Sequence, residues 1–228
     1  MNSREAEIPR MTPALPVTYC GAELVLLADK AIHWPDQGAL LMADVHIGKA
    51  ATYRRLGQPV PHGTTADNLA RIDHLLARYP SERLIILGDF LHAPEAHNLA
   101  TLHALGQWRQ QHAALEVILI RGNHDRRAGD PPAELGIRSV AEPLLLGPLA
   151  LQHEPDPHPT HGVIAGHVHP MRVLRGPGRE RLRLPCFHFE DRMCLMPAFG
   201  LFTGGMNVDA TDGSRQYIVA EGGVWKVG

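Results

Sequence analysis

The chain has 228 residues, of which 44% are hydrophobic and 20% charged, and its formal net charge is −2. This composition is typical of a folded globular protein, and it excludes both a disordered chain and a protein with a strongly basic overall field. The length is sufficient for one α/β domain with an ample core.

We expect residues 1–18 to form a flexible lead-in and residues 19–228 to form a single domain. Two short strands, at 23–27 and 31–34, lead to an apolar strand at 38–43. Helices and strands then alternate: a short helix at 48–56, a helix at 64–79, a strand at 83–87, a helix at 95–112 and a strand at 115–120. The inner face of the last helix is expected to carry Leu99, Leu102, Leu105 and Trp108. This alternation predicts parallel βαβ units.

Beyond about residue 137 the pattern changes to short apolar runs separated by glycine and proline. These runs are 144–146, 149–152, 162–165, 182–187, 193–196, 216–220 and 223–227. They predict a second, more antiparallel sheet without helices. The fold class expected from the whole chain is α/β, with two stacked mixed sheets flanked by helices.

The three cysteines, Cys20, Cys186 and Cys194, match no zinc pattern and are expected to be reduced thiols of a cytoplasmic protein. Residues 1–16 lack the apolar segment of a signal peptide. No run approaches the roughly 18 apolar residues of a membrane helix. The 15 histidines are unusually many and direct attention to metal binding.

Polar side chains follow the ends of five predicted strands. Asp44 and His46 come directly after the strand at 38–43, and their spacing places both side chains on one face of an extended segment. The other four motifs are Gly88-Asp89, Gly122-Asn123-His124-Asp125, His153 and Gly166-His167-Val168-His169. Strand ends in an open α/β sheet share one edge, so these residues can converge there.

The candidate ligands are two carboxylates, one amide and four histidines, with His124 left over. That number is too large for one metal and suits two. Mixed imidazole and oxygen ligands favour Mn, Fe or Zn over Ca. His158 and His161 lie close to His153, but the strand at 149–152 favours His153 as the ligand.

This ordered set of motifs, which covers residues 38–169, resembles the calcineurin-like metallophosphoesterase superfamily, whose fold is an αββα sandwich. The resemblance implies one metal held by Asp44, His46, Asp89 and His169, and a second held by Asp89, Asn123, His153 and His167. It also implies that His124 contacts the phosphate and protonates the leaving oxygen.

Further segments resemble the bacterial ligase-associated DNA-repair metallophosphoesterases of the PdeM type. They are Gly48–Gly57, Gly129–Pro132, Leu182–Phe187, Leu195–Gly200 and Thr203–Gly205. This resemblance implies a manganese-dependent phosphodiesterase that cuts single-stranded DNA, most simply as an endonuclease. It also implies functional partners encoded nearby: a DNA ligase, a helicase-like protein and a nuclease-like protein.

Two cations about 3.5–4 Å apart would clamp the phosphate and acidify a bridging water, so that hydroxide attacks in line. His124, beside Asn123, is the candidate general acid. Asp89, as the expected bridge, is the residue whose loss should empty both metal positions.

Basic residues follow three of the five motifs and are expected to ring the site and bind phosphates of a DNA strand. The candidates are Lys49, Arg54, Arg126, Arg172, Arg175 and Arg179, together with His92. An alternative function is a binuclear phosphohydrolase for a small phosphodiester or phosphomonoester, because the fold alone does not choose between substrates. A non-enzymatic platform is disfavoured because no element of the ligand pattern is missing.

Overall fold

The computed structural model describes residues 13–55, 57, 64–201 and 203–227. Residues 1–12 of the expected lead-in lie outside this range. Residues 14–18 do not continue a lead-in: they form most of strand β1 (Ala14–Tyr19), which pairs in register with β2 (Ala22–Leu27). The boundary expected at residue 18 was therefore too late, because Val17 and Tyr19 are buried in the core and hold this strand in place.

The first sheet contains seven strands in the order of the chain. After β1 and β2 they are β3 (Ala31–Trp34), β4 (Ala39–Ala43), β5 (Arg83–Leu87), β6 (Glu116–Ile120) and β7 (Ile137–Val140). The strands from β1 to β4 form an antiparallel meander, and those from β4 to β7 are parallel. The parallel half is where helices intervene between strands, as expected.

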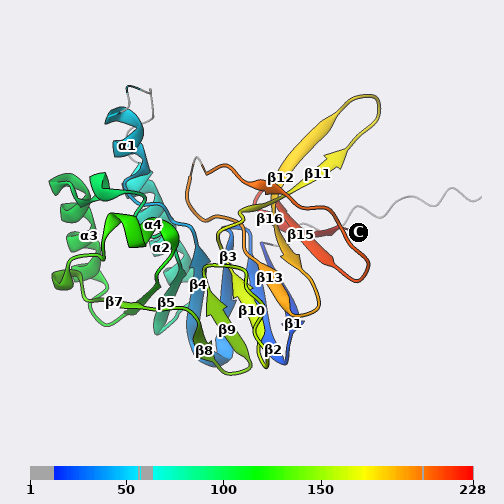
Figure 1. Ribbon diagram of the computed structural model, residues 1–228, viewed down its shortest axis with the longest axis horizontal. Coiled ribbons are helices and arrows are strands. Elements are labelled where there is room, and N and C mark those ends of the chain that lie inside the picture. The colour runs from blue at the N-terminus through cyan, green and yellow to red at the C-terminus, as the bar shows by residue number, and fades with distance from the viewer. Residues whose placement is uncertain (1–12, 56, 58–63, 202, 228) are drawn as a thin grey trace, which may run out of the picture.

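The second sheet follows the order β14-β11-β12-β13-β10-β9-β8, with β15 paired to β12 and β16. Its strands are β8 (Leu144–Leu146), β9 (Leu149–Gln152), β10 (Gly162–Ala165), β11 (Pro170–Arg175), β12 (Arg181–Phe189), β13 (Met193–Leu195), β14 (Met206–Asn207), β15 (Arg215–Ala220) and β16 (Gly223–Val227). Most pairings are antiparallel, whereas β10 runs parallel to both β9 and β13, and β14 runs parallel to β11. The hairpin of β11 and β12 projects from the body of the molecule (Figure 1).

The helices are α1 (Lys49–Arg55), α2 (Thr64–Arg78), α3 (Leu99–Gln111) and α4 (Asn123–Ala128), with short 3-10 turns at Pro35–Gln37, Pro94–His97 and Ala133–Leu135. The helix expected over 95–112 is divided, because the Asn98 side chain accepts a hydrogen bond from the Thr101 amide and starts α3 at Leu99. Leu99 is 88% exposed, so its assignment to the inner face was wrong. Leu105 and Trp108 are buried as expected.

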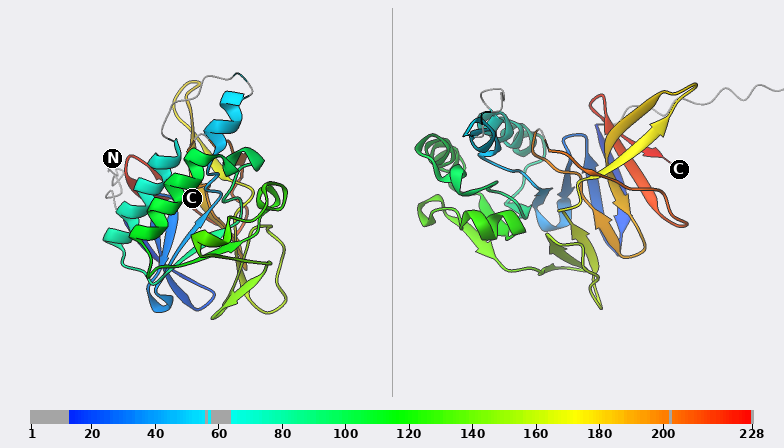
Figure 2. Two further views of the ribbon diagram at one scale, coloured as in Figure 1. Left: turned by 90° about the vertical axis from the view of Figure 1, so that its left-hand side faces the viewer. Right: turned by 45° about the horizontal axis from the view of Figure 1, so that its top comes forward.

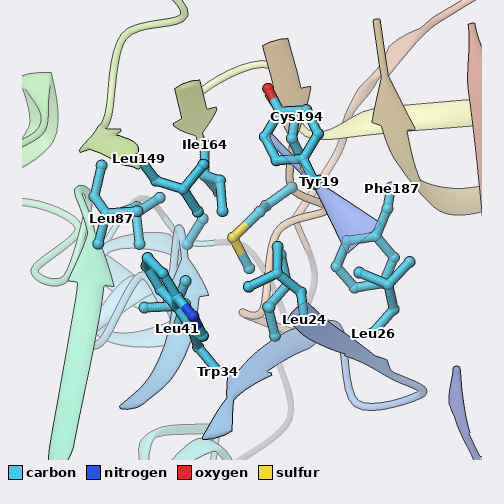
Figure 3. Packing of buried hydrophobic residues seen from close by; sticks show 14 of the residues in the cluster. Tyr19, Leu24, Leu26, Trp34, Leu41, Leu87, Leu149, Ile164, Phe187 and Cys194 are labelled. Carbon is cyan, nitrogen blue, oxygen red and sulfur yellow. The ribbon is translucent and has the colours of Figure 1, made fainter. Parts of the chain in front are cut away.

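Alternate side chains of the central strands enter two separate apolar layers. Leu41 and Ala43 pack between the sheets, against residues such as Ile164 (Figure 3). Leu40 and Met42 face the other way, onto α2 and α3. Each fully buried leucine contributes on the order of 1.5–3 kcal/mol.

The two mixed sheets and flanking helices confirm the expected fold class. Helices α2 and α3 lie on the first sheet, on its face away from the second (Figure 2), and no helix of the described residues covers the outer face of the second sheet. No helix in the described residues is long and apolar enough to cross a membrane.

Candidate metal centre and active site

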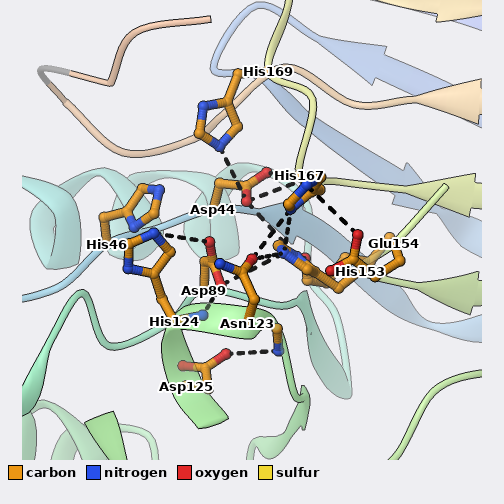
Figure 4. Close-up of polar contacts among 12 residues, drawn as sticks. Asp44, His46, Asp89, Asn123, His124, Asp125, His153, Glu154, His167 and His169 are labelled. Atoms are coloured by element: carbon orange, nitrogen blue, oxygen red, sulfur yellow. Dashed lines mark hydrogen bonds and ion pairs between the residues drawn. The ribbon is translucent and has the colours of Figure 1, made fainter. Parts of the chain in front are cut away.

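The five predicted motifs meet at one edge of the two sheets (Figure 4). The backbone pairing of β4 with β5 continues beyond the ends of both strands. The Asp44 amide donates to the Gly88 carbonyl at 3.1 Å, and the His46 amide donates to the Asp89 carbonyl at 2.8 Å. The neighbouring strands β9 and β10 deliver His153 and the loop with His167 and His169. Residues far apart in sequence are thereby fixed by backbone pairing.

Left-handed backbone conformations are concentrated at this edge. Five of the candidate ligands adopt φ between 50° and 67°: Asp44, His46, Asp89, His167 and His169. Such conformations are uncommon for residues with a Cβ atom and persist where the surrounding structure enforces them. These residues therefore adopt an unfavourable backbone conformation that directs their side chains into the site.

Two motif glycines are required by close packing on ligand side chains. A Cβ atom on Gly88, where φ is +76°, would overlap the His153 ring. A Cβ atom on Gly122 would overlap the Asp89 carboxylate and lie 2.6 Å from the Asp89 amide nitrogen. Gly88 and Gly122 therefore allow the loops to approach each other.

One group of ligand atoms consists of Asp44, His46 and His169, all within 4.8 Å of one another. His169 Nε2 lies 3.2 Å from Asp44 Oδ1. The Nε2 atom of His46 is buried without a hydrogen-bond partner in the described structure, and that of His169, also buried, has only the Asp44 carboxylate beside it. Buried polar atoms are normally paired, so these two nitrogens fit a cation between them. Burial, the largest cause, lowers the pKa of His46 and favours the neutral imidazole that binds metals.

A second group consists of Asn123, His153 and His167. Asn123 Oδ1 lies 2.9 Å from His153 Nε2 and 3.2 Å from His167 Nδ1, and the two nitrogens are 3.0 Å apart. Adjacent ligands with metal bonds of about 2.0–2.2 Å at right angles are separated by roughly 3 Å. The spacing of these three atoms is therefore that of ligands on one face of a metal ion.

Asp89 lies between the two groups. Its Oδ1 is 3.5 Å from His153 Nε2, and it shares a cluster within 4.8 Å with Asp44 and His153. Burial raises the pKa of Asp89, and the neighbouring Asp44 carboxylate adds to this effect. Two buried carboxylates side by side favour bound cations, as a bridging ligand requires.

Backbone carbonyls fix the orientation of two of these imidazoles. The Nδ1 atom of His153 donates to the Leu87 carbonyl at 3.1 Å, and that of His169 donates to the Gly204 carbonyl at 3.0 Å. Each interaction places the N–H on Nδ1 and leaves Nε2 as the electron-pair donor. Outer partners of this kind orient metal ligands and raise their basicity.

His167 has a carboxylate as its outer partner. Its Nδ1 faces Asn123, while its Nε2 lies 3.5 Å from Glu154 Oε2. Glu154 is held in turn by Arg126 Nη2 at 3.5 Å from its Oε1. Glu142 completes this support, since its Oε2 accepts hydrogen bonds from the backbone amides of His153 and Glu154 at 2.8 and 3.0 Å.

His124 occupies the open side of the site. Its Nδ1 donates to the His92 carbonyl at 2.7 Å, and its backbone amide donates to Asp89 Oδ1 at 2.9 Å. Its Nε2 lies 3.9 Å from Asp89 Oδ2, and the side chain is 32% exposed. The Nε2 atom is thus directed toward the candidate metals and remains accessible.

His92, expected to contact phosphate, packs against the other histidines. Its ring stacks on that of His124 with centroids 4.9 Å apart, and its Nδ1 lies 3.3 Å from Nδ1 of His46. Burial lowers the pKa of His92 to about 4. A neutral His92 can accept a hydrogen bond from the Nδ1–H group of His46, which leaves the lone pair of His46 Nε2 free to bind a metal.

The basic residues are distributed over three elements. Lys49 begins α1 next to the site, and burial lowers its pKa. Arg54 also lies in α1, but its side chain is outside the described part. Arg126 is engaged by Glu142 and Glu154, at 3.4 and 3.5 Å, so it supports the ligands of the second group and is not a free cation.

The remaining arginines lie on the β11–β12 hairpin. Arg175 and Arg179 are exposed, at the end of β11 and in the following turn. Arg172 is half-buried nearer the body, and its Nη1 lies 3.8 Å from Asp209.

Three supporting residues were missed by the sequence reasoning. Asp125 accepts hydrogen bonds from the Leu91 and Gly122 amides at 2.9 and 3.0 Å, which ties two motif loops together. Its position in the Gly-Asn-His-Asp motif was a usable signal. Glu154 adjoins His153 in sequence, which was a weaker signal, and nothing in the sequence indicated Glu142.

Comparisons with known proteins identify the family of this chain. Residues 39–147 match the family model for calcineurin-like phosphoesterases. The crystal structure of Pseudomonas putida nuclease MPE is 55% identical in sequence, with a TM-score of 0.84 over 94% of this chain and 100% of that chain. This chain belongs to the calcineurin-like phosphoesterases. It is a metallophosphoesterase, a hydrolase of a family that uses divalent metals.

A search of curated proteins found no match to this phosphoesterase. Among solved structures, the Escherichia coli phosphoesterase Yfce is 16% identical, with a TM-score of 0.41 over 80% of this chain and 88% of that chain. A likeness that low adds nothing to the assignment.

Proposed function

We propose that this phosphoesterase is a manganese-dependent endonuclease that hydrolyses phosphodiester bonds of single-stranded DNA. The observation that carries the proposal is the meeting of two ligand groups on either side of Asp89, with His124 Nε2 directed at them. The 55% identity to a nuclease supports a nucleic acid as substrate.

We assign the first metal to Asp44, His46, Asp89 and His169, and the second to Asp89, Asn123, His153 and His167. When bound, two such metals supply Lewis-acid activation of the phosphate and of water. The mix of nitrogen and oxygen donors accepts Mn, Fe or Zn, and the resemblance to the PdeM type is the reason for proposing Mn among them.

The chain's own residues position and protonate the substrate. With Nδ1 committed to the His92 carbonyl, His124 can carry a second proton only on Nε2, the atom that faces the centre. It can release that proton to the leaving oxygen, a role worth about 10²–10⁴-fold in rate. Asn123 orients this group by holding the same loop against His153 and His167.

The DNA contacts that we propose are Lys49 and Arg54 on α1, and Arg172, Arg175 and Arg179 on the hairpin, with His92 at the edge of the centre. We also propose that the chain from Ala14 onward acts as a single domain in the cytoplasm, where the free thiols of Cys20, Cys186 and Cys194 stay reduced. A DNA ligase, a helicase-like protein and a nuclease-like protein are the proposed functional partners.

The decisive experiment uses metal-stripped protein reloaded with each divalent cation. Circular single-stranded DNA, linear duplex DNA and a small phosphodiester are the substrates. Manganese-dependent cleavage of the circle is the expected result, since a circle has no end for an exonuclease. Activity on the small diester alone would favour the alternative, a phosphohydrolase of small molecules.

A further inference from the structure

The β11–β12 hairpin is a projecting arm that starts at the candidate centre. Pro170, the first residue of β11, directly follows His169. Both the hairpin and α1 rise from the edge that carries the site, as two views agree (Figures 1 and 2). The Gly176 amide donates to the Glu180 carbonyl at 3.1 Å and closes the turn at the tip.

The strand register sorts the arginines of this arm onto two faces. Arg175 is directly opposite Arg181, and Val173 is directly opposite Arg183. Directly opposite residues share a face, and neighbours along a strand alternate. Arg175, Arg181 and Arg183 therefore lie on one face, whereas Arg172 lies on the other with Leu174, Leu182 and Leu184.

The arginines of the charged face are not paired with carboxylates within the described residues, and the Glu180 carboxylate of the same turn lies beside Gly176. Within the described residues, no ion pair is formed by Arg175, Arg179 or Arg181. Arg183 Nε donates to Asn207 Oδ1, a neutral amide. Like charges directly opposite each other on a sheet are destabilising unless an anion lies between them. A polyanion is the ligand that this face fits.

We propose that this face of the arm holds the phosphates of the DNA strand on one side of the bond being cut, so that the enzyme requires several nucleotides there. This inference rests on the proposed nuclease function. The six residues of β11, at ~3.3 Å each, span about 20 Å from His169 to Arg175. A strand advances at least about 3.4 Å per nucleotide, so the arm reaches at most about six nucleotides.

The test compares the double variant R175A/R181A with the control R138A/R192A. Arg138 and Arg192 are exposed and lie at the opposite edge of the sheets, at the start of β7 and just before β13. The kcat/KM of each protein is measured on oligonucleotides of 4 to 20 nucleotides and on a small phosphodiester. Each oligonucleotide is assayed over a range of salt concentrations.

For the wild type and the control, kcat/KM should rise with length on one side of the cut and level off within about six nucleotides. R175A/R181A should lose that rise, keep its activity on the small diester, and show a salt slope smaller by about 1.4, at roughly 0.7 for each lost phosphate contact. An unchanged length profile and salt slope, or an equal loss on the small diester, would overturn the role of the arm. If the wild type cleaves no oligonucleotide, the proposed nuclease function itself fails.

Discussion

Glu154 offers the sharpest test of the second metal position. Glu154→Gln removes the charge that faces His167 Nε2 at 3.5 Å but keeps the size of the side chain. Loss of an outer partner of a metal-bound histidine costs about 10–100-fold in metal affinity, which corresponds to about 1.4–2.8 kcal/mol. Because His167 belongs to only one ligand group, the affinity for one of the two metal ions should fall and the affinity for the other should stay unchanged.

Calorimetric titration of metal-stripped protein with manganese measures both steps. Glu116→Gln is the matched control, because Glu116, like Glu154, has two charged partners, here Arg83 and Arg138 at 3.2 and 3.0 Å, but lies at the start of β6 and away from the site. The melting temperature of the metal-free protein should change little in either variant, since exposed ion pairs contribute about 0–1 kcal/mol. Equal weakening of both steps, or the same shift in Glu116→Gln, would refute the reasoning.

Three further predictions follow from the same geometry. Asp89→Asn should reduce bound metal at both positions, whereas His46→Gln should mainly empty one; metal analysis of the purified proteins decides, and equal losses would contradict the bridge. His124→Gln should retain both metals and lose about 10²–10⁴-fold in DNA cleavage, but lose less on a nitrophenyl ester, whose leaving group needs no proton; equal losses on both substrates would remove the acid role. Gly122→Ala should abolish activity by displacing the Asp89 carboxylate. Gly106→Ala, in α3, where the added Cβ meets no atom from outside its own helix backbone within 4 Å, should instead stabilise the fold by about 0.4–1 kcal/mol in thermal unfolding. An active Gly122→Ala enzyme would show that the loops can move apart to accommodate the methyl group.

The strands and motif loops could be predicted because their signals are local. Apolar runs such as 38–43 and 83–87 end directly at Asp44 and Gly88, and parallel strands bring such ends together. The break in the helix at Asn98 was missed because helical periodicity continues through it, and only the cap to Thr101 reveals the start of α3. The short helix α4 was not predicted, although Asp125 accepts a hydrogen bond from the Gly122 amide at the start of this helix.

The outer partners of the ligands could not be predicted in the same way. Glu142 reaches the amides of His153 and Glu154 from a segment that precedes β8, and no spacing rule connects these positions. Arg126 illustrates the same limit. Its charge predicted a contact with phosphate, but its carboxylate partners are brought beside it only by the packing of the two sheets.

Strand β12 is exposed along its first residues and fully enclosed along its last. Its inner half, from Cys186 to Phe189, pairs with β15 on one side, and His188 and Phe189 also pair with β13 on the other, while its outer half pairs with β11 in the arm. The arm is therefore a rigid extension of a core strand and not a hinged flap. A strand of DNA bound to the arm would keep a constant orientation relative to the metals. The enzyme would therefore position its substrate without a conformational closure.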